Sequence, residues 1–124
     1  MSGVLMAISI NGRFTPLQLV LSRREPVQLA LYLRNNGNEE KRLTVKVSLS
    51  PALAFTKGGF KNSELLRVDS IKPGEEKTLY FDLFPKPGAK PGEQEIAVKI
   101  QEHYSNYQYT KAQYNASFTL KVSE

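Results

Sequence analysis

The sequence predicts an all-β protein, either a sandwich or a barrel, with about seven to eight short strands. The first reason is alternation: apolar side chains occupy every second position in Val27–Leu33 and again in Leu43–Leu49, as in strands with one buried face. The second is that Gly and Pro interrupt the chain often. The third is that no segment keeps apolar residues at helical spacing over several turns.

The stretch Pro26–Ser50 is the centre of the predicted fold because it contains both alternating runs. The segment Asn35–Asn38 between them is rich in Asn and Gly, which can supply the positive φ angles of a turn. Pro26 has no N–H to donate, so it suits the start or edge of a strand. We expect the other strands to pack onto this pair.

Further strand candidates lie on both sides of this stretch. Asn11-Gly12 predicts a break after the first of them, and Pro73-Gly74 predicts a tight turn before a later one. The candidates are Val4–Ile10, Leu17–Leu21, Leu65–Ile71, Lys77–Phe84, Gln94–His103 and Asn115–Val122.

Three aromatic residues fall on the predicted outer faces of their strands: Tyr32, Tyr80 and Phe84. If these strands are neighbours, the aromatic side chains form an exposed patch suited to a partner or a homodimer. The alternative is that the connection Ala52–Leu66 covers them. The sequence leaves both open.

The bulk properties indicate one soluble domain covering residues 1–124. The net charge is +5, but Lys and Arg are interleaved with acidic residues, which is typical of a solvated surface. The chain has no Cys, which excludes disulfides and thiolate chemistry. No apolar run approaches the ~18 residues of a membrane helix, so we expect no membrane insertion. We expect a cytoplasmic protein if the chain is complete, and an extracellular or cell-surface one if it is a piece of a longer protein.

No residue pattern predicts catalysis, a metal or a cofactor. His103 is the only histidine, and its neighbours Glu102 and Ser105 are no evidence for a catalytic site, since adjacent strand residues point to opposite faces. We interpret His103 as a surface residue at the end of a strand. The acidic pairs Glu39-Glu40 and Glu75-Glu76 fall in predicted turns. One His, no Cys and two separated Asp residues do not make a zinc or calcium site.

Tyrosines give the clearest signal of binding. Four of them fall in the predicted loop Tyr104–Tyr114, with Ser, Asn and Gln between them. Tyrosine offers a large rigid surface with a polar tip, and this composition is typical of binding loops. The alternative is a long hairpin whose tyrosines pack across strands. The candidate binding residues are Tyr104, Tyr107, Tyr109 and Tyr114.

Three turn signatures follow one another along the chain: Asn35–Asn38 leading into Leu43–Leu49, Ile71–Glu75 before Leu79–Phe81, and Pro91-Gly92 before Ile96–Val98. In this order they resemble the turns of the CARDB domains, and also those of the related immunoglobulin-like domain associated with alpha-galactosidases. The resemblance implies an immunoglobulin-like β-sandwich of about seven to eight antiparallel strands. It also implies a structural or adhesive role without catalysis, and it offers no fixed functional residues.

The function expected from these observations is a non-catalytic protein-interaction or structural module. Its protein partner is not identified by the sequence, and a homodimer through the outer-face aromatics or the sheet edges is a second possibility. A carbohydrate or cell-surface adhesion module is the alternative, with tyrosines stacking on sugar rings. A basic nucleic-acid binder ranks below both, because only Lys111 accompanies the tyrosines in the predicted loop.

Overall fold

The computed structural model describes residues 7–104 and 106–124, which form nine β-strands and one short 3-10 turn. The 3-10 turn is η1 (Leu21–Arg23). The strands are β1 (Ile8–Thr15), β2 (Gln18–Val20), β3 (Val27–Asn35), β4 (Lys41–Leu49), β5 (Leu53–Ala54), β6 (Ser63–Ile71), β7 (Glu76–Pro85), β8 (Gly92–His103) and β9 (Thr110–Ser123).

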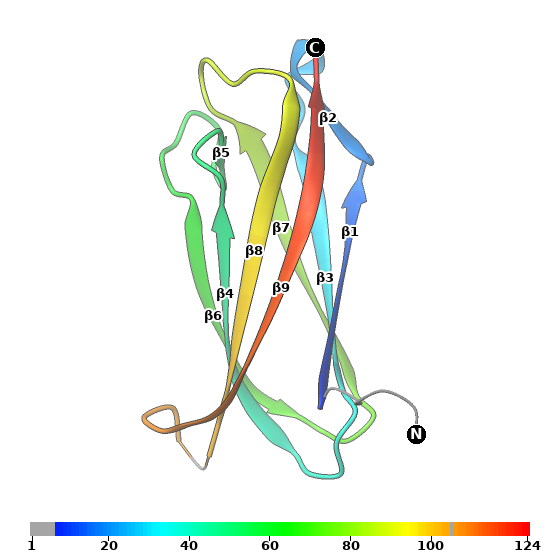
Figure 1. The fold of residues 1–124 in the computed structure, drawn as a ribbon, viewed down its shortest axis with the longest axis vertical. Helices are drawn as coiled ribbons and strands as arrows, with labels where there is room; N and C mark the ends of the chain where they lie inside the picture. The colour runs from blue at the N-terminus through cyan, green and yellow to red at the C-terminus, as the bar shows by residue number, and fades with distance from the viewer. Residues whose placement is uncertain (1–6, 105) are drawn as a thin grey trace.

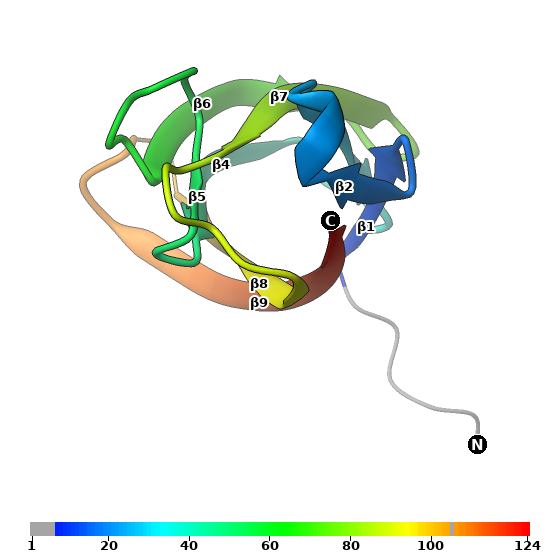
Figure 2. The ribbon, with the colours of Figure 1, turned by 90° about the horizontal axis from the view of Figure 1, so that it is seen from above.

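The strands form two sheets that face each other across an apolar core (Figures 1 and 2). One sheet has the order β1-β3-β7-β5, and the other has the order β2-β9-β8-β4-β6. All neighbours pair antiparallel except β2 and β9, which are parallel. The predicted all-β sandwich is confirmed, with two very short strands, β2 and β5, besides the seven long ones.

The two strands of the central stretch lie in opposite sheets and do not form a hairpin. β3 pairs with β1 and β7, whereas β4 pairs with β6 and β8. Their alternating residues point at each other across the core: Leu29, Leu31 and Leu33 from one side, Val45 and Val47 from the other, all fully buried. Burying each such side chain stabilises the fold by about 2 kcal/mol.

The predicted turn chemistry of Asn35 is wrong. No residue of Asn35–Asn38 has a positive φ angle. Instead the Asn35 side chain is fully buried and holds two turns together. Its amide nitrogen donates to the carbonyl oxygens of Glu39 (2.7 Å) and Ile71 (2.8 Å), and its Oδ1 accepts from the backbone N–H of Gly37 (2.9 Å). This buried amide therefore joins the β3–β4 turn to the end of β6.

The expected break at Asn11-Gly12 does not occur, because β1 runs through both residues. A Cβ added at Gly12 would meet the ring of Phe118 on β9 at 3.0 Å, so the glycine here makes room for a packed aromatic side chain. Of the expected strand Val4–Ile10, residues 8–10 belong to β1, and residues 4–6 lie outside the described residues. The expected strand Leu17–Leu21 shortens to β2, and Leu17 is 78% exposed.

The outer-face aromatics lie on neighbouring strands, as the patch hypothesis requires. Tyr80 of β7 is opposite Ala30 of β3, two positions along from Tyr32, which is opposite Thr78. Tyr80 is exposed and Tyr32 is partly buried, while Phe84 is flanked by Ala54 of β5. The connection Ala52–Leu66 therefore pairs with β7 at Phe84, but it leaves Tyr80 exposed.

Candidate protein-interaction site

The tyrosine-rich segment joins β8 and β9 and projects from one end of the sandwich (Figure 1). The backbone N–H of Tyr104 donates to the carbonyl of Tyr109 (3.2 Å), which joins the two ends of the connection and makes it a hairpin. The predicted loop Tyr104–Tyr114 is thus too long, because β9 already begins at Thr110. Tyr114 belongs to β9, opposite Ile100 of β8.

A buried ion pair lies at the base of this hairpin. Lys41 of β4 and Glu102 of β8 are 9% and 3% exposed, and Lys41 Nζ lies 3.1 Å from Glu102 Oε2. Both side chains occupy inward-facing positions of their strands. Irregularities in the pairing occur between Lys41 and Leu43 and between Glu102 and His103. Such bulges redirect side chains locally, and here they accompany the change from an apolar to a charged core.

The second oxygen of this carboxylate is also satisfied. The hydroxyl of Tyr114 donates to Glu102 Oε1 over 3.0 Å. Burial, reinforced by this hydrogen bond and by the negative charge of Glu102, raises the pKa of Tyr114 from its ordinary 10.0 to about 12. Lys111 of β9 lies between Glu102 (3.8 Å) and Glu39 (3.7 Å) at the surface. Glu102 thus connects β4, β8 and β9.

His103 ends β8 as predicted, but it is only 6% exposed, so the surface assignment is wrong. Its Nδ1 lies 3.2 Å from the carbonyl oxygen of Tyr109, and its Nε2 lies 2.6 Å from the Thr44 hydroxyl. A carbonyl can only accept, so Nδ1 carries the proton in the neutral ring, and Nε2 then accepts from Thr44. The ring therefore ties the hairpin backbone to β4.

Tyr107 lies back over the sheet rather than pointing into solvent. Its hydroxyl donates to the carboxylate of Asp69 on β6, and its ring meets His103 edge-on at 5.3 Å. The guanidinium groups of Arg67 and Arg42 lie over the ring, 4.4 and 5.3 Å from its centroid. Burial and the neighbouring Asp69 raise the pKa of Tyr107.

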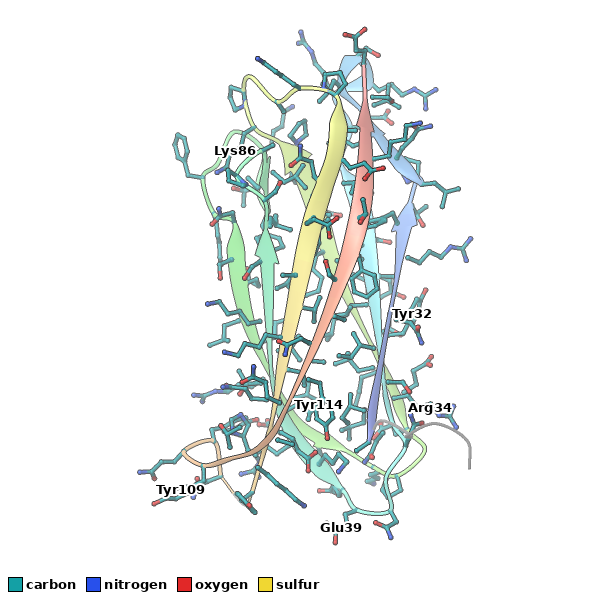
Figure 3. All side chains as sticks on the ribbon, viewed as in Figure 1. Tyr32, Arg34, Glu39, Lys86, Tyr109 and Tyr114 are labelled. Atoms are coloured by element: carbon teal, nitrogen blue, oxygen red, sulfur yellow. The ribbon has the colours of Figure 1, made fainter. Side chains whose placement is uncertain are left out.

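Tyr104 and Tyr109 are the two exposed aromatics of the hairpin, at 58% and 59% exposure. Figure 3 shows Tyr109 on the part of the hairpin that projects furthest from the strands. Lys111 Nζ lies 5.9 Å from the ring centroid of Tyr104. A shallow recess of about 320 Å³ lies beside Tyr104, lined also by Glu39, Glu40, Glu102, His103 and Lys111.

The four predicted binding residues thus divide into two pairs. Tyr104 and Tyr109 are presented to solvent, whereas Tyr107 and Tyr114 anchor the hairpin to the sandwich. Sequence reasoning missed Lys41 and Glu102. The sequence contained a signal, because both residues stand at inward-facing positions of alternating strands and their charges are opposite to each other. Lys41 precedes Leu43 and Val45, and Glu102 follows Val98 and Ile100.

The described residues contain no group of three or more His, Asp or Glu side chains placed to hold a metal ion. Glu75, from one of the predicted acidic turns, accepts from the backbone N–H of Lys72 (2.8 Å) and pairs with Lys77 (3.2 Å), and these contacts lower its pKa. Its carboxylate therefore stabilises the β6–β7 turn.

Within residues 7–104 and 106–124, no helix has the length and hydropathy needed to cross a membrane.

Comparison with known proteins supports the architecture. No protein-family model matches the chain, and no curated protein matches its sequence. Among solved structures, one covers 93% of this chain with a TM-score of 0.66 and 17% identity: native alpha-2-macroglobulin from Escherichia coli, spanning domain MG7 to the C-terminus. This chain spans 16% of that one. A FixG-related protein from Vibrio parahaemolyticus has a TM-score of 0.49 and 14% identity, covering 94% of this chain and 99% of its own.

The chain has an immunoglobulin-like β-sandwich fold. At 17% identity the likeness to the macroglobulin segment shows the fold alone. It supports the sandwich that the CARDB resemblance implies, but not membership of that family. Function must therefore be argued from the surfaces of this chain.

Removing the charge of Glu102 tests the buried ion pair. We expect Glu102→Gln to lower the free energy of unfolding by about 3 kcal/mol, because it leaves the buried Lys41 ammonium without its partner. Glu64→Gln is the matched control: Glu64 pairs with Lys61 at 2.8 Å, but that lysine is 55% exposed, so the loss is below about 1 kcal/mol. Urea unfolding measures both. Equal losses would contradict the assigned role of Glu102.

The raised pKa of Tyr114 predicts a loss of stability at high pH. Both states keep the phenol proton below pH 10, but between pH 10 and about 12 the unfolded chain loses it while the folded chain keeps it. The stability advantage of the wild type over Tyr114→Phe should therefore shrink by about 1 kcal/mol between roughly pH 9 and 11.

Urea unfolding at several pH values checks this, and the same comparison in the Glu102→Gln background is the control. Because Glu102 contributes to the raised pKa, the pH dependence should be smaller there. A difference between wild type and Tyr114→Phe that does not change with pH would contradict the assignment.

Proposed function

We propose that this domain is a non-catalytic protein-interaction module that contacts its partner through the tip of the β8–β9 hairpin. The observation that carries the proposal is the division of the four tyrosines: Tyr104 and Tyr109 are exposed, while Tyr107 and Tyr114 are held by the sandwich. Exposed aromatic side chains on an ordered support are typical anchors of protein interfaces.

Preorganisation is the physical advantage of this arrangement. Binding costs less when the contacting side chains are already held in position. His103 fixes the backbone at Tyr109, and Tyr107 packs the middle of the connection onto β6 through Asp69. The hairpin therefore needs little ordering when a partner arrives. The polar side chains of Asn106 and Gln108, both exposed, would form the rim around the aromatic anchors.

A carbohydrate or cell-surface adhesion module is the second candidate, because Tyr104 and Tyr109 are the kind of exposed rings on which sugars stack. The CARDB-like resemblance of the turn sequences favours such an adhesive role, which would place the domain outside the cell. A protein-interaction module without an adhesive role is equally suited to the cytoplasm.

A homodimer through Tyr80 is a further proposal. Nucleic-acid binding at the hairpin has less support, because Lys111 is already paired with acidic groups.

A pull-down tests the proposal directly. The bait is the intact domain with Tyr104 and Tyr109 both changed to serine, compared with the wild type in a lysate of the source organism. We expect a protein retained by the wild type to be lost from this double variant, while circular dichroism shows an unchanged fold, because neither side chain supports the core.

The matched control is Tyr32→Ser with Tyr80→Ser, which removes two tyrosines from the outer face of the other sheet. It should keep the partner. Loss of the partner from the control alone would move the contact to that face, and retention by both variants would contradict the hairpin proposal. Binding of the wild type to sugar arrays, lost in the hairpin variant, would favour the carbohydrate module instead.

A further inference from the structure

A groove of about 580 Å³ lies between η1, the β5–β6 connection and the loop after β7. These three segments lie at the opposite end of the sandwich from the tyrosine hairpin (Figure 1). Its apolar lining comes from Leu21, Phe84, Pro85, Pro87 and Ala89. A second hollow of about 420 Å³ shares Lys86–Ala89 with the first, so the two flank the same loop. Volumes of this size are typical of binding grooves.

The charged residues that line the two hollows are all cations: Arg24, Lys57 and Lys86 in the first, and Lys90 in the second. None of these four takes part in an ion pair within the described part of the chain. By contrast, Lys41, Lys61, Lys77 and Lys111 all have acidic partners. These four cations are therefore not neutralised by a direct ion pair among the described residues.

The groove is built on constrained backbone. Arg24 has φ 57°, an uncommon value for a residue other than glycine, and its N–H donates to the carbonyl of Leu21 (3.3 Å). The backbone N–H of Lys86 donates to the carbonyl of Ala52 (2.8 Å), and prolines on both sides fix its neighbours. Gly88 turns the loop with φ 84°. The backbone that carries Arg24 and Lys86 is therefore held in place before a ligand binds. Figure 3 shows Lys86 at this end of the molecule.

We propose that this groove binds an extended acidic peptide segment of a partner protein, with carboxylates facing Arg24, Lys57 and Lys86 and apolar side chains resting on Leu21 and Phe84. The inference goes beyond the hairpin proposal, because it concerns another surface with another chemistry. Charge complementarity and the apolar floor together select this occupant.

Single-stranded nucleic acid fits the same surface less well. Such ligands are held by successive aromatic platforms as well as by cations. The lining of both hollows contains one aromatic residue, Phe84, and it is partly buried. A floor of proline, leucine and alanine side chains suits apolar residues of a peptide better than the faces of bases.

The test uses a fluorescent peptide of alternating glutamate and leucine, about ten residues long, which reaches about 33 Å when extended. A peptide with glutamine for glutamate and a thymidine oligonucleotide are the comparison ligands. Anisotropy at roughly 50 and 300 mM salt gives the affinity and its screening. Amide shifts in NMR spectra of the labelled full chain locate the bound ligand. Lys57→Gln with Lys86→Gln is the test variant.

The matched control is Lys46→Gln with Lys99→Gln, which removes the same charge from the outer face of the five-stranded sheet. We expect saturable binding of the glutamate peptide, weakened by added salt, with shifts centred on Lys57, Lys86 and Gly88. The test variant should bind about tenfold more weakly and the control less than about twofold. The affinity should not change in the hairpin variant that lacks Tyr104 and Tyr109.

Four outcomes would overturn the proposal. They are the absence of saturable binding, equal binding of the glutamine peptide, equal weakening by the test and control variants, and tighter binding of the oligonucleotide at the groove. Equal weakening would show an effect of net charge alone, and the last outcome would assign the surface to nucleic acid.

Discussion

The carboxylate of Glu102 is the constraint on which the tyrosine end of this sandwich depends. A buried charge is costly unless it is paired and hydrogen-bonded, and Glu102 has both kinds of partner: the ammonium of Lys41 and the hydroxyl of Tyr114. These residues come from β8, β4 and β9, so satisfying one carboxylate fixes three strands of the same sheet relative to one another. The apolar core ends at Glu102, and between this carboxylate and the surface the contacts are polar.

A second set of contacts holds the hairpin itself. His103 binds the carbonyl of Tyr109, and Tyr107 donates to the carboxylate of Asp69. The side chains of Tyr104 and Tyr109 remain exposed beside these contacts. The other end of the molecule has a different character, with apolar hollows, proline-rich backbone and cations that have no acidic partner among the described residues. The domain thus offers two chemically distinct surfaces at its two ends.

Much of the fold followed from alternation, because period-two patterns report directly on which face is buried. The strands that contain Leu29–Leu33, Val45–Val47 and Ile96–Ile100 were predicted in this way. Two errors had a common cause: tertiary contacts overrode local preference. Gly12 continues a strand because Phe118 needs the space, and Asn35 acts through its side chain rather than through a positive φ. The sequence left open whether Tyr114 binds a partner or packs across strands, because its partner Glu102 is close only once β8 and β9 pair.

We propose that the hairpin is an ordered support for Tyr104 and Tyr109, held to the sandwich by the contacts of His103 and Tyr107. Nitrogen-15 relaxation of the backbone amides of Tyr104, Tyr107 and Tyr109 tests it most directly, with the amide of Val45 in β4 as the rigid reference. Order parameters of about 0.85 at all four amides would agree with the account. Values below about 0.6 at the three hairpin amides, beside a rigid Val45, would contradict it.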